Sequence, residues 1–160
     1  MRHGLALSAL EHGPRGDAGR KLSRDGEAQI ALSSKRLKEL GVSPALIISS
    51  PFRRAVETAD IAAEHFPAAG RAIVPSLAAP VSITGILNDI AAASGDAPSV
   101  LVIGHQPTLS SLCGLLLSTD GPPFSTGSFA YLKFQKEPRL PGGPGAGKAV
   151  LAELFAPEPI

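Results

Sequence analysis

The stretch VLVIGHQPTLSSLCGLL, residues 100–116, contains a strand, a turn and a helix in direct succession. The run Val100 to Ile103 is continuously apolar, which is typical of a strand buried on both faces of a parallel sheet. This run ends at the polar turn Gly104-His105-Gln106-Pro107. Apolar side chains then recur at helical spacing (Leu109, Leu112, Cys113 and Leu116). The stretch therefore predicts a buried strand that delivers a polar turn to the start of a helix.

Strands and helices alternate through the rest of the chain. Helices are predicted for residues 23–40, 50–66 and 83–93, and strands for residues 45–48, 73–74, 129–134 and 149–155. We expect Ser23 to cap the first helix and Gly41 to end it, and Ser50-Pro51 to begin the second helix as N-cap and first residue. The alternation predicts an α/β fold of three layers, in which helices cover both faces of a mostly parallel central sheet. The last two strands add an antiparallel C-terminal hairpin, whose loop contains the Pro/Gly-rich residues 138–147.

Composition limits the class of protein. The 160 residues are 44% hydrophobic and 18% charged and contain no internal repeat, so we expect one domain over residues 1–160. The 15 Lys and Arg residues nearly balance the 14 Asp and Glu residues, which argues against a nucleic-acid-binding protein. No apolar run is long enough to cross a membrane, and the single cysteine, Cys113, lacks a partner for an internal disulfide. We therefore expect a cytoplasmic protein without a nucleic-acid or membrane partner.

Polar residues follow two of the predicted strands. The cluster Ser49-Ser50-Pro51-Phe52-Arg53-Arg54 follows the strand at 45–48, and Gly104-His105-Gln106-Pro107 follows the strand at 100–103. The carboxyl ends of parallel strands meet at one edge of a sheet, where the ligands of open α/β folds bind. Each cluster also leads into a helix, whose N-terminal amides and dipole attract an anion. Arg54 is placed to reach such an anion, because a guanidinium binds phosphate through paired hydrogen bonds.

A third cluster, Arg2-His3-Gly4, lies at the start of the chain. If the three clusters converge, the site combines anion-binding arginines with an imidazole nucleophile. Arg2 and Arg54, with a protonated His105, would spread positive charge over the oxygens of a phosphoryl group. Neutral His3 would attack phosphorus in line, and water would hydrolyse the resulting phosphohistidine. Since arginines supply the charge that Mg²⁺ supplies elsewhere, we expect no metal and no organic cofactor.

These clusters resemble the ordered signatures of the histidine phosphatase superfamily, which has the phosphoglycerate mutase-like fold. The resemblance rests on Arg2-His3-Gly4, on SPFRRAVETA at residues 50–59, on Gly104-His105-Gln106-Pro107 and on FSTGS at residues 124–128. The length of the chain and the segment RKLSRDG at residues 20–26 are similar to the short SixA-type phosphohistidine phosphatases. The resemblance therefore implies a hydrolase that acts on phosphorylated substrates.

By this resemblance, His3 is the nucleophile that accepts the phosphate, and Arg53 faces the solvent or the rim of the pocket. The catalytic residues that it implies are Arg2, His3, Arg54 and His105. The residues that it implies for substrate binding are Arg2, Gly4, Arg54, His105 and Gln106.

The chain has no carboxylate between Glu64 and Asp89. Many phosphomonoesterases and mutases of the superfamily carry a glutamate in this part of the chain, which protonates an alkoxide leaving group. An imidazole, with a pKa of about 6.5, leaves without that help. This favours phosphohistidine on a protein as the substrate, and Asp17 is the candidate proton source if the loop after the first motif folds over the pocket. Two alternatives stay open: a broad small-molecule phosphomonoesterase, and a non-catalytic module that binds phosphate or a phosphoprotein.

Only Met1 precedes Arg2-His3-Gly4, whereas members of the superfamily place a buried central strand before this motif. A sheet without that strand would leave backbone groups unpaired and the nucleophile unanchored. We therefore expect that the N-terminal central strand is missing from residues 1–160 and that the native polypeptide extends upstream of Met1.

Overall fold

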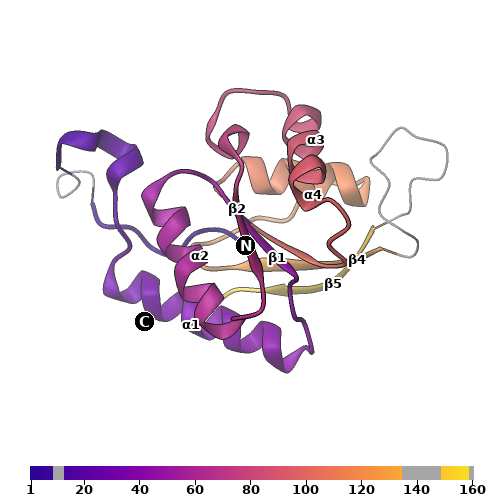
Figure 1. The fold of residues 1–160 in the computed structure, drawn as a ribbon, viewed down its shortest axis with the longest axis horizontal. Helices are drawn as coiled ribbons and strands as arrows, with labels where there is room; N and C mark the ends of the chain where they lie inside the picture. The colour runs from indigo at the N-terminus through magenta and orange to yellow at the C-terminus, as the bar shows by residue number, and fades with distance from the viewer. Residues whose placement is uncertain (9–12, 135–148, 159–160) are drawn as a thin grey trace.

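A parallel three-stranded sheet forms the centre of the molecule (Figure 1). The computed structural model describes residues 1–8, 13–134 and 149–158. The strands lie in the order β2-β1-β3 and are β1 (Leu46–Ser49), β2 (Gly70–Ile73) and β3 (Val100–Ile103). The last residue of β1, Ser49, lies level with the last residues of both neighbours, Ile73 and Ile103. Because the strands end together, the loops after β1 and β3 emerge side by side.

Helices cover both faces of this sheet. One face carries α1 (Arg24–Glu39) and α2 (Arg53–His65), and the opposite face carries α3 (Ile83–Ser94) and α4 (Thr108–Leu117) (Figure 1). Ile47 of β1 belongs to the core under α1 and α2, whereas its neighbour Ile48 belongs to the core under α3 and α4. Adjacent side chains of a strand point to opposite faces, so one short strand serves both cores. The predicted three-layer α/β fold is confirmed.

The C-terminal hairpin has the predicted strands, β4 (Phe129–Phe134) and β5 (Ala149–Phe155), paired antiparallel. It forms a two-stranded sheet separate from the parallel one. The predicted Pro/Gly-rich loop at residues 138–147 lies outside the described residues. No helix in the described part of the chain is both long and apolar enough to span a membrane.

Two predicted boundaries are wrong. The N-cap of α2 is Phe52 rather than Ser50, and no side chain caps this end of the helix. The Ser50 hydroxyl instead accepts a hydrogen bond from the Phe52 amide (3.3 Å) and contacts the His105 ring (2.8 Å), so it joins two loops. Strand β2 covers residues 70–73 rather than 73–74, because its register follows β1. The caps of α1 are confirmed: the Ser23 hydroxyl accepts from the Gly26 amide, and Gly41 follows with a φ of 73°.

Residues 1–3 lie between β3 and the segment that leads into β4, at the centre of the molecule (Figure 1). The Met1 amino group donates to the Val102 carbonyl (2.8 Å), and the His3 amide donates to the Gly104 carbonyl (3.1 Å). On the other side, the Arg2 amide donates to the Ser128 carbonyl (2.8 Å). Backbone hydrogen bonds therefore hold the Arg2-His3 segment from two sides.

Candidate active site

The three polar clusters converge at the carboxyl end of the parallel sheet. The Ser50 amide donates to the Ile103 carbonyl (3.0 Å), which ties the loop after β1 to the end of β3. The His3 and His105 rings lie 5.0 Å apart between centroids, with their planes tilted by 56°. Arg54, in the first turn of α2, reaches back to the His3 ring. The sequence clusters thus form one site, as expected.

The His3 ring is buried, and both of its nitrogens have partners. Its Nδ1 lies 2.7 Å from the Gly4 carbonyl oxygen, which can only accept, so Nδ1 carries the proton. Its Nε2 then holds the lone pair and accepts a hydrogen bond from Arg54 Nε (3.1 Å). Burial is the largest cause that lowers the pKa of His3, to about 3. The hydrogen bond to Gly4, the next largest effect, acts to raise the pKa, and the charges of His105, Arg54 and Arg2 lower it further. His3 is therefore a neutral imidazole at pH 7, with its lone pair directed toward an arginine.

His105 is also neutral, which differs from the expected cation. Its Nε2 lies 2.8 Å from the Ser50 hydroxyl, and its buried Nδ1 has no hydrogen-bond partner among the described residues. Burial, followed by the charge of Arg54, lowers the pKa of His105 to about 4. A cationic His105 thus requires an anion beside it that offsets the arginines. Its unpartnered nitrogen is a group that such an anion would satisfy.

Two guanidinium groups supply positive charge beside the histidines. Arg2 donates from one terminal nitrogen to the Phe124 carbonyl (2.8 Å), while its buried Nε has no partner among the described residues. Arg54 is 8% exposed, and its guanidinium carbon lies 5.0 Å from the centre of the Phe52 ring. A buried and a half-buried guanidinium group beside neutral imidazoles favour an anion, and phosphate fits their paired donors.

Asp17 reaches the same arginine from the loop after the first motif. This residue belongs to a 3₁₀ segment, Gly13–Gly19. Arg54 donates from one terminal nitrogen to the Asp17 carbonyl (2.8 Å) and from the other to the Asp17 carboxylate (3.1 Å). The same carboxylate accepts from Arg20 (3.1 Å). The loop therefore folds toward the pocket, as the sequence analysis required for a role of Asp17.

Asp17 is ionised in this structure, so it has no proton to donate to a leaving group. Its burial acts to raise the pKa, but the hydrogen bonds and charges of Arg20 and Arg54 outweigh this and hold the pKa below the usual range. Asp17 is therefore a carboxylate at neutral pH, and a carboxylate only accepts hydrogen bonds.

Gly4 and Gln106 lie beside the site, but the hydrogen bonds of the Gly4 amide and the Gln106 side chain go to other residues of the protein. The Gly4 amide donates to the Thr58 hydroxyl (3.2 Å). The Gln106 side chain donates to the Ser110 hydroxyl (2.8 Å) and accepts from the Ser110 amide (3.2 Å) at the start of α4. Substrate binding by these two residues stays a prediction.

Three groups that the sequence analysis did not assign support the reacting residues. Thr58 accepts from Gly4 and donates to the Arg54 carbonyl (2.7 Å), so it joins the first and second motifs. Its place in α2 one turn after Arg54, on the buried stripe, is the signal that indicates this role. Ser50 holds His105, and the Phe124 carbonyl holds Arg2. No local pattern predicts these last two contacts, because they join residues far apart in the chain.

The side chain of Arg53 is 39% exposed, which is compatible with the expected place in the solvent or at the rim. Its Nε donates to the Glu57 carboxylate (2.7 Å), and the second Glu57 oxygen accepts from the Leu22 amide (2.8 Å). Arg53 and Glu57 thus tie α2 to the segment that precedes α1, while Arg54 faces the pocket.

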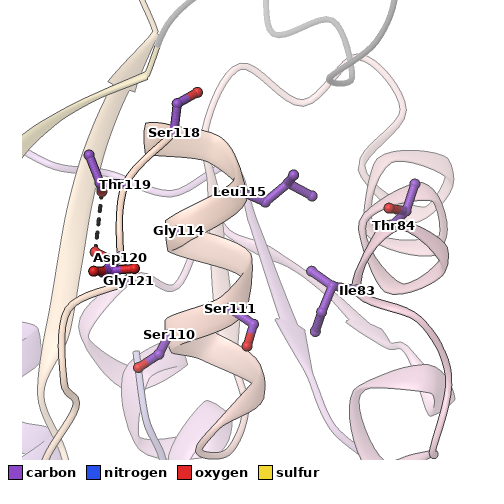
Figure 2. A pocket seen from close by; sticks show the side chains of 10 residues that line it. All are labelled: Ile83, Thr84, Ser110, Ser111, Gly114, Leu115, Ser118, Thr119, Asp120 and Gly121. Carbon is purple, nitrogen blue, oxygen red and sulfur yellow. Dashed lines mark hydrogen bonds between the residues drawn. The ribbon is translucent and has the colours of Figure 1, made fainter.

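The surface has a separate hollow between α4 and the start of α3 (Figure 2). Ile83 of α3 and Leu115 of α4 face it from opposite sides (Figure 2). Asp120 is the one ionisable side chain among the described residues that line it, and none of them is a histidine or an arginine. The hollow therefore lacks the groups that bind and attack a phosphoryl group. No group of three or more His, Cys, Asp or Glu side chains in the described ranges is arranged to hold a metal ion.

Comparisons with known proteins give a family and a fold. Residues 1–74 match the family model described as "Histidine phosphatase superfamily (branch 1)". An uncharacterized protein from Picosynechococcus sp. is 36% identical over 111 residues, which span 68% of this chain and 66% of that relative.

Several solved structures have the same fold. The protein histidine phosphatase SixA complexed with tungstate superposes with a TM-score of 0.79 at 24% identity, over 98% of this chain and 94% of that chain. SixA from Agrobacterium tumefaciens superposes with a TM-score of 0.78 at 20% identity, over 98% and 95% of the two chains. A mycobacterial glucosyl-3-phosphoglycerate phosphatase complexed with VO3 superposes with a TM-score of 0.69 at 18% identity, over 98% and 97%.

Proposed function

Because residues 1–74 match the model of the histidine phosphatase superfamily, we propose that the chain is a member of it and a phosphatase that carries the phosphoryl group on His3 before releasing it to water. Its substrate in this proposal is a protein that bears phosphohistidine. The observation that carries the proposal is the pair of hydrogen bonds on the His3 ring. The Gly4 carbonyl holds the proton on Nδ1, and Arg54 holds the lone pair of Nε2 toward the anion-binding groups.

In the first step, the substrate phosphate binds among Arg2, Arg54 and His105. Arg54 transfers its Nε hydrogen bond from His3 to a phosphate oxygen, which frees the Nε2 lone pair to attack phosphorus. As this bond forms, the bond between phosphorus and the substrate imidazole breaks, and its electron pair leaves with the imidazole. The charge that develops on the phosphoryl oxygens is stabilised by groups already in place, which is the main source of catalysis in phosphoryl transfer. The phosphate dianion also raises the pKa of His105, which then donates a hydrogen bond to it.

In the second step, water attacks the phosphorus bound to His3. The bond between His3 Nε2 and phosphorus breaks, the electron pair returns to the ring, and inorganic phosphate leaves with both protons of the water. The proton stays on Nδ1 of His3 through both steps, hydrogen-bonded to the Gly4 carbonyl, so the same tautomer of His3 is restored.

The leaving group decides the substrate class in this proposal. Asp17 is the carboxylate that hydrogen bonds place against the arginines, and its pKa is lowered, so it does not protonate an alkoxide at neutral pH. Loss of a general acid costs a factor of roughly 10²–10⁴ when the leaving group is poor. An imidazole avoids this cost, because its ring carries a proton near neutral pH. Phosphohistidine is therefore the substrate that the site favours.

The test is turnover of a phosphohistidine-bearing protein by the purified chain in the presence of a chelator. We expect release of phosphate and a phosphoenzyme trapped by acid-free quenching, and loss of both in His3→Ala. Glu64→Gln, at an exposed position near the end of α2, is the matched control and should behave as the parent chain. Turnover that persists in His3→Ala would contradict the covalent route. Equal turnover of an alkyl phosphate would point to a phosphomonoesterase, and phosphate binding without turnover to a binding module.

A further inference from the structure

We propose that Asp17 selects substrates by their leaving group: its carboxylate accepts the ring N–H of a protonated imidazole that departs from phosphorus. The inference rests on the proposed function and adds a specificity-determining residue to it. It assigns Asp17 the role of an anionic acceptor, which is the opposite of a proton source.

The position of Asp17 relative to the nucleophile is the first argument. Arg54 contacts both groups with one guanidinium: its Nε donates to His3 Nε2 (3.1 Å), and its terminal nitrogens donate to the carbonyl (2.8 Å) and the carboxylate (3.1 Å) of Asp17. A phosphoryl group bound along this guanidinium has His3 toward one end and Asp17 toward the other. In-line transfer places the leaving nitrogen on the side of phosphorus away from the nucleophile. Asp17 therefore lies on the side from which the leaving group departs.

The state of the carboxylate is the second argument. The side chain of Asp17 is 58% exposed, whereas that of Arg54 is 8% exposed, so the carboxylate lies at the mouth of the site and the guanidinium inside it. The neighbouring Arg20 and Arg54 keep it ionised. An ionised carboxylate at the mouth attracts a cationic ring and gives no proton to an alkoxide.

The hydrogen bonds of the loop are the third argument. The main-chain bond from Arg54 to the Asp17 carbonyl leaves the side chain free to turn toward a substrate without undocking the loop. Arg20 holds the other carboxylate oxygen and donates from its Nε to the Leu7 carbonyl (2.8 Å). Arg20 therefore keeps its hydrogen bond to the carboxylate when Arg54 binds phosphate.

The step that Asp17 serves is balanced without a proton transfer to or from it. His3 Nε2 supplies an electron pair to phosphorus, and the bond between phosphorus and the substrate nitrogen breaks. The electron pair of that bond returns to the departing ring, which already carries a proton on its other nitrogen and leaves as neutral imidazole. Asp17 accepts the hydrogen bond from this N–H before and after the bond breaks, and it stays ionised throughout.

The test compares two substrates in Asp17→Asn. The asparagine keeps one oxygen that can accept from Arg54, but it removes the negative charge and replaces the oxygen that accepts from Arg20 with an amide nitrogen. We expect kcat/KM for phosphoimidazole to fall by about tenfold or more, the usual effect of losing a charge-assisted hydrogen bond, while kcat/KM for p-nitrophenyl phosphate changes by less than about twofold. Asp89→Asn, at an exposed aspartate of α3, is the matched control and should leave both values unchanged.

The pH dependence gives a readout that a merely structural role would not move. The ratio of parent to Asp17→Asn activity on phosphoimidazole should decline toward one as the pH rises above the pKa of the substrate ring, because the neutral ring has no N–H to donate. The inference is overturned if both substrates lose activity equally, if neither does, or if the ester loses more than the phosphoimidazole, as a proton donor requires. A phosphoenzyme formed on His3 from the phosphohistidine-bearing protein keeps the proposed function intact in each of those cases, and its absence overturns the proposed function itself.

Discussion

Thr58 shows how a single residue outside the reacting groups holds the site together. Its side chain is fully buried, and its hydroxyl both accepts from the Gly4 amide (3.2 Å) and donates to the Arg54 carbonyl (2.7 Å). Gly4 in turn supplies the carbonyl that fixes the proton on His3. One hydroxyl thus sets the distance between the nucleophile and the arginine of the anion site.

Replacing Thr58 by valine should impair both stability and turnover. The change keeps the shape of the side chain but leaves the buried Gly4 amide unpaired, which costs about 1–3 kcal/mol. We expect a lower urea midpoint and a lower kcat with little change in KM, since the arginines remain. Thr58→Ser keeps the hydroxyl and should recover most of the activity. A valine variant with the parent's kcat would show that this hydroxyl does not position His3.

Residue identities were more predictable than residue contacts. Arg2, His3, Arg54 and His105 were predicted from motifs, and the structure brings all of them together. Ser50 was predicted to cap a helix, but it contacts His105 instead, 55 positions away in the chain. The local rule fails there because it cannot include a partner that only the packing of the loop after β3 brings beside Ser50.

At the scale of elements, the first motif packs directly on the start of α1. A Cβ atom at Gly4 would lie 2.5 Å from the Gly26 carbonyl oxygen, and a Cβ at Gly26 would overlap the Leu5 carbonyl. The Ser23 amide also donates to the Leu5 carbonyl (2.9 Å). The backbone of residues 4–5 therefore lies against the first turn of α1 with no room for a side chain.

Gly26→Ala should destabilise the protein although it lies in a helix. Alanine is ordinarily about 1 kcal/mol more favourable than glycine in a helix, but overpacking costs about 1–3 kcal/mol. Gly85→Ala is the matched control, because Gly85 is also the third residue of its helix and donates its amide to the capping serine, Ser82. There the new Cβ meets only the Ser82 hydroxyl, at 3.1 Å.

Thermal unfolding measures both glycine variants. We expect the melting temperature to fall for Gly26→Ala and to stay level or rise for Gly85→Ala. A rise in both melting temperatures would mean that the backbone of residues 4–5 moves aside at little cost, and it would contradict the inferred rigidity of the first motif.

At the scale of the whole molecule, the fold holds the buried His3 and the half-buried His105 as neutral rings at the carboxyl end of the parallel sheet, beside the N-terminal segment. The pKa values of His3 and His105 are lowered to about 3 and about 4, burial being the largest cause for each. Both pKa values lie below the ordinary value of about 6.5. At a pH between the lowered value and about 6.5, the unfolded chain therefore binds more protons than the folded chain. The stability that these rings contribute is therefore present above about pH 6.5 and is lost as the pH falls toward 4.

Urea unfolding at several pH values should reveal this loss. We expect the free energy of unfolding to decrease between pH 6.5 and 4, by at most about 1.4 kcal/mol per pH unit for each histidine. His105→Gln should flatten part of this slope. Equal slopes in the parent and His105→Gln would contradict the burial of His105 as a neutral ring.

The sequence by itself determined the layers of the fold and the chemical identity of the site. Apolar periodicity and helix ends are local signals, and β3, β4 and β5 have the predicted bounds for that reason. The tertiary structure alone decided how these parts act on one another: the neutral state of His105, the bonds of Asp17 to Arg54, and the hydroxyls of Ser50 and Thr58 that hold the reacting groups. Protonation and long-range hydrogen bonds depend on which groups share one buried volume, and that volume exists only after segments far apart in the chain have packed together.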